Sequence, residues 1–466
     1  MLAGGLGAGA LIALPDISLA GRTAAGSVAG PVAGASAGTI GAAGSAVPAS
    51  RYVLLYGTPG TSPFHGGSFA AAQAPKVRSS ALPAPKSVAA QLASAPVSSP
   101  DQSSVALVTV DAVSSGSQVT LTLVDSTTAV IEKQGSLTIT DVPEGTNILA
   151  TPVFAPGTTT IAVVLAITEP GAKRMIRKID PLTGDLVTMP GTSYTSHHAL
   201  AYFDTATGSF AGPFHLGNAP ALALSTAAAN GSDLFLWTTA EPQASQATKG
   251  KGTADTTPQI SAFPLGSGKP RFTVPGLHPW PASEPVVTLP SGDAARLVNG
   301  RTVQVCSARS GDLTQTTIAS LNVIKAKPSA ITMEARSDGT VFMTKPGIGK
   351  AIITDPADSF RVKNEISFPV PTSPLGAPWS KAVLSASGDT LYVLGAAKTG
   401  GVSAYDVATG KLTGSYSQGD NHSGLYLLPS GTLLATSAAN PRLTFYSSSL
   451  SPLGTLETSL QISAVF

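Results

Sequence analysis

Cysteine is almost absent from this chain of 466 residues, in which Cys306 is the only one. A disulfide within the chain is therefore impossible, and a metal centre built on several cysteine ligands is excluded. We expect Cys306 to be an inert, buried small hydrophobic residue, the usual role of a lone thiol.

Charge is also scarce, at 12% of residues against ~25% in an ordinary soluble protein. The net charge is only +2, and Lys and Arg are scattered without forming a run. Nothing here provides the basic patch that a nucleic acid partner needs, so we expect none. With 48 Gly and 37 Pro, the composition favours short strands and turns over long exposed helices, which indicates an all-β fold.

Long apolar runs are missing too, so the mature chain has no predicted membrane-spanning segment. Residues 1–14 are apolar but short and rich in glycine, which is typical of the central part of an export signal. The run resembles the part of a bacterial twin-arginine signal that follows the two arginines. We therefore predict a signal-like segment over 1–20 and a secreted or cell-envelope protein, a disordered Gly/Ala-rich tail being the alternative. Residues 21–50 are predicted to be a low-complexity linker, disordered or removed from the mature protein.

A repeated pattern of a turn followed by a strand fills the chain after the linker. Residues 51–56 form the first credible strand, and the Pro-rich stretch 66–100 is expected to be irregular. From residue 100 on, seven turns rich in Ser, Pro, Asp, Asn or Gly each precede a β-branched or aromatic run. They lie at 100–101, 156–157, 230–231, 291–292, 338–339, 388–389 and 430–431. The last four turn glycines are 47, 49 and 43 residues apart, close to the ~40–50 residues of a four-stranded propeller blade.

A second motif, apolar-Asp-x-x-Thr-Gly, occurs at 179–184, 203–208 and 405–410, with a degenerate copy at 306–311. Its aspartates resemble catalytic residues, but the spacing fits a hairpin turn. Asp accepts hydrogen bonds from the turn amides, and Gly adopts the positive φ that closes the turn. We interpret these residues as turn formers.

Together the two motifs resemble the YVTN-type repeat of seven-bladed β-propellers, most closely over 376–446. The resemblance implies a propeller over 51–466, with seven blades, or eight if 51–56 and 460–466 form an additional closing blade. Strands from the two ends would then pair and close the ring. It also implies that the ligand binds on a funnel face, formed by the connections between blades and those between second and third strands. We expect a monomer.

Candidate binding residues lie in three predicted connections between blades. They are His278 and Trp280, then Trp379, then Asp420, Asn421 and His422. Aromatic groups beside polar ones suit a peptide or sugar. The alternatives are that Trp280 and Trp379 fill gaps between blades and that His422 and its neighbours cap a turn. The adjacent pair His197 and His198 would point to opposite faces of a strand and could not bind one metal, so we predict no metal site and no cofactor.

Two classes of function fit this sequence. The favoured one is an extracytoplasmic binding or scaffold propeller that recognises a protein, peptide or glycan on its funnel face. The alternative is a propeller enzyme, such as a metal-dependent lactonase or a lyase. Such an enzyme needs acidic or imidazole groups that converge on the channel. The chain has 26 Asp and Glu and only 6 His, and most aspartates fall in turns, so we predict no catalytic residue.

Overall fold

The computed structural model describes the strands of the chain and many of their connections. The residues described are 51–56, 65–70, 78–81, 91–92, 97–100, 103–125, 130–140, 142–179, 186–219, 224–239, 259–275, 285–298, 300–321, 331–336, 338–369, 381–385, 387–395, 401–416, 422–427, 431–437, 442–457 and 462–465. Over these residues the structure is all-β. Its only helical elements are short 3-10 turns at η2 (Ala319–Leu321), η3 (Pro346–Ile348) and η4 (Pro356–Asp358).

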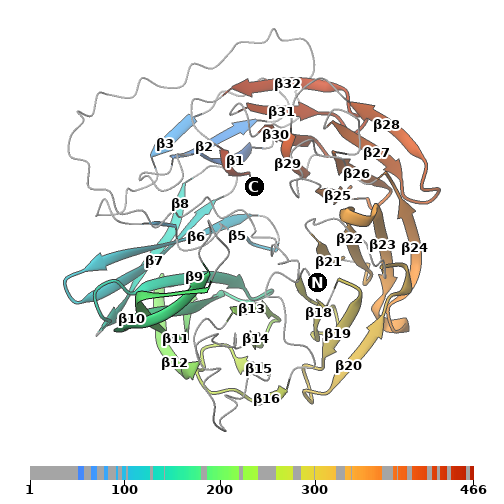
Figure 1. Cartoon of the computed structure of the whole chain (residues 1–466). Coiled ribbons are helices and arrows are strands. Elements are labelled where there is room, and N and C mark those ends of the chain that lie inside the picture. Colours follow the sequence, from blue (N-terminus) through green and yellow to red (C-terminus); the bar gives the residue numbers. More distant parts are fainter. Residues whose placement is uncertain are drawn as a thin grey trace.

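The described strands form antiparallel sheets arranged in a ring (Figure 1). Seven sheets have four strands and one has five. In chain order, the five-stranded sheet contains β4 (Gln91–Leu92), β5 (Val97–Ser98), β6 (Ser104–Val113), β7 (Gly116–Asp125) and β8 (Ile131–Thr140). The next two contain β9 (Asn147–Phe154), β10 (Thr160–Ile179), β11 (Leu186–Asp204) and β12 (Ser209–Ala219), then β13 (Leu224–Ala229), β14 (Asp233–Thr239), β15 (Gln259–Pro264) and β16 (Phe272–Pro275).

The second half of the ring repeats the same unit with shorter strands. Its sheets contain β17 (Val286–Thr288), β18 (Ala294–Val298), β19 (Thr302–Cys306) and β20 (Leu313–Thr317); β21 (Thr332–Ala335), β22 (Val341–Lys345), β23 (Lys350–Asp355) and β24 (Arg361–Ser367); β25 (Ala382–Leu384), β26 (Thr390–Leu394), β27 (Val402–Asp406) and β28 (Leu412–Tyr416); and β29 (His422–Leu427), β30 (Leu433–Ser437), β31 (Arg442–Tyr446) and β32 (Pro452–Glu457).

The remaining sheet joins the two ends of the described chain. Its strand order is β3 (Arg78–Ala81), β2 (His65–Ala70), β1 (Arg51–Tyr56) and β33 (Ile462–Val465). Leu54 lies opposite Val465 in the β1–β33 ladder and opposite Gly67 in the β1–β2 ladder. This sheet closes the ring, and the all-β propeller fold predicted from the sequence is confirmed. Counted with it, the described sheets number eight, the larger of the two blade counts that the sequence left open.

The stretch 66–100, expected to be irregular, differs from that expectation. It contributes β2 and β3 to the closing sheet and the short β4 and β5 to the five-stranded sheet. The strands avoid the prolines of this stretch, of which the structure describes only Pro100, which follows β5. This is expected because proline is excluded from the inside of a ladder. A strand such as β1 has donors and acceptors on both edges, and β2 satisfies those on the edge away from β33.

The predicted turns lie where the pattern placed them. The five turn motifs that the structure describes in full each immediately precede the second strand of a sheet, counted from the inner edge, and the described Pro100 and Gly431 of the other two lie just before β6 and β30. Gly339 and Gly388 take φ of +84° and +77°, which an L residue rarely adopts. Three Asp-x-x-Thr-Gly frames join third and fourth strands, whereas the frame at 179–184 follows β10, a second strand, and lies beyond the described residues after Ile179.

The aspartates of the second motif cap turns, as predicted. Asp406 accepts hydrogen bonds from the backbone N and the hydroxyl of Thr409, at 2.7 and 2.5 Å. Asp204 accepts from the backbone N of Ala206 at 2.9 Å. In the degenerate copy, the hydroxyl of Ser307 takes the place of the carboxylate and accepts from the backbone N of Arg309 at 3.3 Å.

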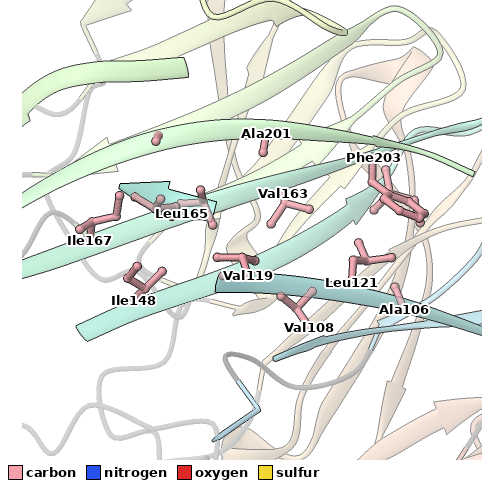
Figure 2. Packing of buried hydrophobic residues seen from close by; sticks show 14 of the residues in the cluster. Ala106, Val108, Val119, Leu121, Ile148, Val163, Leu165, Ile167, Ala201 and Phe203 are labelled. Carbon is pink, nitrogen blue, oxygen red and sulfur yellow. The ribbon is translucent and has the colours of Figure 1, made fainter. Parts of the chain in front are cut away.

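The hydrophobic core lies between neighbouring sheets rather than in one central mass. Figure 2 shows the cluster between the five-stranded sheet and the β9–β12 sheet, where Val119 and Leu121 of β7 pack with Val163 and Leu165 of β10. Alternate residues of β10, among them Val164, belong to the next cluster around the ring. Both faces of the strand are therefore buried, which explains its nearly continuous apolar sequence.

Hydrogen bonds also link neighbouring sheets. The hydroxyl of Tyr392, on β26, donates to the carbonyl of Ser448 in the β31–β32 turn at 3.0 Å. Tyr202 donates in the same way to the carbonyl of Ser267, in the β15–β16 turn, at 2.9 Å. These tyrosines are buried, so the bonds fix each sheet against the next.

Two features depart from a regular ring. Beyond Glu169 and Thr195, β10 and β11 pair only with each other and form a two-stranded ribbon. The outermost strand β24 presents alternating exposed charges, Arg361, Lys363 and Glu365. They form ion pairs with Asp358, Asp355 and Lys350 respectively.

Candidate functional site

The sequence-predicted site residues fall almost wholly outside the described part of the chain. His278, Trp280, Trp379, Asp420 and Asn421 lie outside it, and of His422 only the backbone is described, as the first residue of β29. The strands on either side show that all three segments join one sheet to the next. Whether these side chains form a site remains a prediction.

Three described groups with perturbed pKa values lie on or beside the inner strands of three consecutive sheets. They are Glu334 on β21, Lys381 at the start of β25 and Tyr426 on β29. In the ring, β21, β25 and β29 lie on the inner side, and β24, β28 and β32 form its outer rim (Figure 1). We define these three residues as the inner-strand site.

The inner-strand site follows the repeat. Glu334 and Tyr426 each stand five residues before a turn glycine, Gly339 and Gly431, so they occupy equivalent places in their sheets. Lys381 belongs to the sheet between those two. It stands seven residues before Gly388, which is two residues earlier than the position that Glu334 and Tyr426 occupy. The repeat thus gives the three residues related positions on successive sheets, although they lie far apart in sequence.

Lys381 and Tyr426 contact each other across two sheets. The Nζ of Lys381 lies 4.1 Å from the centroid of the Tyr426 ring, well within the range of a cation–π interaction. The backbone of Lys381 is fixed as well, since its carbonyl accepts a hydrogen bond from the backbone N of Leu394 at 2.8 Å. Burial lowers the pKa of the Lys381 amine to about 8 and raises that of the Tyr426 hydroxyl.

Gly424 makes room for the ring of Tyr426. A Cβ at position 424 would come within 2.6 Å of the Thr436 hydroxyl and 3.1 Å of a Tyr426 ring carbon. The aromatic ring therefore lies close against the backbone two residues earlier. A larger residue at 424 would displace the ring that faces the Lys381 ammonium.

Glu334 combines exposure with an unfavourable environment for its charge. Its side chain is exposed, yet desolvation by the surrounding protein raises the pKa of its carboxyl, an effect that Arg336 partly opposes. Such a position is suited to contact with a ligand.

Other buried polar groups serve the fold. Lys345 donates from Nζ to the carbonyls of Gly300 and Leu321, at 3.1 and 3.0 Å, and burial lowers its pKa. Cys306 is fully buried, as predicted, and burial together with the nearby Asp293 and Asp312 raises its thiol pKa to about 11. A thiol with this pKa is un-ionised at neutral pH and unreactive.

The histidine pair behaves as the strand geometry predicted. His198 is buried, whereas His197 is half-buried and its ring centroid lies 5.7 Å from that of His215 on β12. Over the described residues, no group of three or more His, Cys, Asp or Glu side chains is placed to hold a metal ion.

Sequence reasoning missed the inner-strand site because it searched the connections for rare residues. Lys, Glu and Tyr on short strands look like ordinary strand residues when each repeat is read alone. Glu334 and Tyr426 both lie five residues before the turn glycine of their repeat. The β17–β20 and β25–β28 repeats have valine at this position, Val287 and Val383, so comparing the position between repeats would have found two of the three residues.

Comparison with known proteins identifies similar folds only. No protein-family model matches the sequence, and no curated protein matches it. Among solved structures, a proposed 6-phosphogluconolactonase from Bacteroides fragilis is similar over 90% of this chain and 98% of its own, with 14% identity and a TM-score of 0.41. A second, from Bacteroides uniformis, covers 90% and 99% with 15% identity and a TM-score of 0.42.

A more partial match is the virginiamycin B lyase of Staphylococcus aureus, which covers 48% of this chain and 67% of its own, with 12% identity and a TM-score of 0.32. At such identities and TM-scores these similarities do not bear on function. The described residues also include no helix that is long and apolar enough to cross a membrane.

Proposed function

We propose that this chain is an extracytoplasmic binding propeller of the YVTN-repeat type, which recognises a protein, peptide or glycan on the inner side of its ring. The observation that carries the proposal is the inner-strand site. It sets a cation, an aromatic ring and a carboxyl on three consecutive sheets of a rigid scaffold. Few convergent polar and aromatic groups on a preformed surface are what a binding site requires.

The connections between sheets belong to the same proposal. His278, Trp280, Trp379, Asp420, Asn421 and His422 lie in or next to the three connections that follow β16, β24 and β28. Each connection leads into an inner strand. The second leads through Lys381 into β25, and the third leads into β29, which carries Tyr426. We propose that these residues extend the binding surface outward from the inner-strand site.

Binding to arrays of defined peptides and glycans tests the proposal. The wild-type protein should bind members of one class, and the double variant Lys381→Met, Tyr426→Leu should lose that binding while remaining folded. Asp338→Asn, in a turn between β21 and β22, is the matched control and should bind as wild type does. Binding that survives the double variant would place the ligand elsewhere.

Trp379→Ala tests the outer part of the surface. We expect array binding to fall while the melting temperature stays nearly unchanged. A buried gap-filling tryptophan would behave differently, because its truncation costs about 3–5 kcal/mol of stability. A sharp loss of stability with binding intact in the folded fraction would therefore remove Trp379 from the site.

The enzyme alternative rests on one observation, the lowered pKa of Lys381. An amine with a pKa of about 8 is partly uncharged near neutral pH, so it can accept a proton from a substrate. Incubation with a panel of lactones tests this lactonase or lyase alternative. Hydrolysis releases acid, which is measured by titration at constant pH. Turnover by the wild type that disappears in Lys381→Met would favour the enzyme, whereas a binding protein should leave every lactone unchanged.

A further inference from the structure

Two histidines lie side by side on neighbouring strands of the β9–β12 sheet, His197 on β11 and His215 on the outermost strand β12. Their ring centroids are 5.7 Å apart, and the ring planes are tilted by 47°. His197 is half-buried and His215 is exposed, so a small ion can reach both imidazoles from solvent. His198 is buried and, as the next residue along the strand, belongs to the opposite face.

The separation of the two rings fits a metal ion held between them. An imidazole nitrogen binds Zn²⁺ at about 2.0–2.1 Å. Because the ring centre lies about 1 Å behind that nitrogen, two imidazoles on one ion have centroids roughly 4.5 to 6.5 Å apart, depending on the angle at the metal. The observed 5.7 Å lies inside this range. The χ2 torsion of histidine is broad, so each ring can turn a nitrogen towards a shared ion.

The backbone holds the two histidines in place. His215 lies opposite Ala199 in the β11–β12 ladder, and His197 lies opposite Asn218. Alternate residues of a strand share a face, and so do residues that lie opposite each other, which places His197 and His215 on one face of the sheet. Since both strands are paired at these positions, little backbone freedom is lost when one ion joins the two side chains.

The charges on this face favour a cation. Glu169 lies opposite Thr195 in the β10–β11 ladder, which puts it diagonally next to His197 on the same face. A carboxylate near this position attracts a divalent ion. Neither β11 nor β12 contains Lys or Arg, and the basic residues of β10 begin at Lys173, beyond the shift in its register with β11.

We propose that His197 and His215 bind a divalent transition-metal ion, with water completing its coordination. The sequence prediction of no metal site differs, because it considered only the adjacent pair His197 and His198. Imidazole ligands suit Cu²⁺, Ni²⁺ and Zn²⁺ rather than Mg²⁺ or Ca²⁺, and Cu²⁺ is the ion that such ligands bind most tightly. Two protein ligands are consistent with the lack of any group of three or more ligating side chains in the described part of the chain.

Isothermal titration calorimetry of the untagged full chain with Cu²⁺ tests the inference, in a glycine buffer that competes for weakly bound ions. His197→Gln and His215→Gln should each weaken the strongest Cu²⁺ site at least tenfold, because the remaining imidazole loses a second ligand held beside it. His65→Gln, in the closing sheet, is the matched control and should bind as wild type does. Equal Cu²⁺ affinity in the wild type and both site variants would overturn the inference.

Electron paramagnetic resonance of the Cu²⁺-loaded protein identifies the ligands directly. We expect coupling to two imidazole nitrogens in the wild type and in His65→Gln, and to one in each site variant. Circular dichroism melting verifies that every variant is folded, and Cu²⁺ should raise the melting temperature of the wild type more than that of the site variants. A wild-type spectrum without two coupled imidazoles would show that the rings make only an aromatic contact, and the proposed site would then be wrong.

Discussion

Aspartate side chains at four turns accept hydrogen bonds from nearby backbone or hydroxyl groups. For each of them these bonds lower the carboxyl pKa below its usual range, most directly at Asp406, where Thr409 donates twice. The four are Asp204, Asp338, Asp389 and Asp406. Asp338 and Asp389 are exposed and Asp204 and Asp406 are half-buried, all at the surface, so solvent screens the contribution of each.

The four turn aspartates predict how stability responds to acid. A carboxyl whose folded pKa is depressed stabilises the fold above its unfolded pKa, and this contribution is lost as the pH falls through the folded value. The urea midpoint should therefore fall between about pH 7 and about pH 3. In a variant with all four aspartates changed to asparagine, the fall should be smaller. An identical pH response would show that these caps do not contribute.

Tyr392 predicts the value of a link between sheets. Tyr392→Phe removes the hydrogen bond to the Ser448 carbonyl and keeps the buried ring, so we expect a loss of about 0.5–1.5 kcal/mol in the free energy of unfolding. Tyr202→Phe breaks the equivalent bond to Ser267 and should cost a similar amount. Urea denaturation of both variants measures this. A neutral result for both would mean that solvent replaces the bonds at no cost.

At the level of elements, the sequence predicted what depends on neighbouring residues. Turns such as 338–339 and 405–410 carry their own chemistry, an Asp acceptor and a Gly with positive φ, so their positions could be predicted without a structure. The strands β2 to β5 lack such signals, because they are only two to six residues long and rich in small residues, with no Asp-and-Gly turn motif to mark where they begin. The contact of Lys381 with Tyr426 was likewise out of reach, since it requires knowing how adjacent sheets align.

The closing strand β1 gives a prediction at the same level. Leu54 is paired on both sides, so Leu54→Pro must remove a ladder hydrogen bond whichever neighbour its N–H faces. We expect a loss of about 3 kcal/mol or more and a broader unfolding transition as the ring opens. Leu54→Val is the control and should retain a single sharp transition. If the proline variant unfolds as sharply as wild type at the same urea concentration, closure through β1 does not stabilise the ring.

For the molecule as a whole, export remains a proposal based on residues 1–50. Their composition cannot bury enough apolar surface to offset the entropy of an ordered chain. N-terminal sequencing of protein recovered from outside the cytoplasm should begin after about residue 20. An intact Met1 on protein confined to the cytoplasm would contradict both the signal and the secreted or cell-envelope location.

The charged face of β24 bears on how the protein behaves when concentrated. An outermost strand has a free edge on which a second molecule could extend the sheet, the usual beginning of aggregation. Arg361, Lys363 and Glu365 place charges along that edge, in a chain where only 12% of residues are charged. Replacing all three with threonine should leave the ring folded but produce growing particles in dynamic light scattering, whereas the wild type should stay a monomer. The few charges of this chain would then act as its protection against self-association.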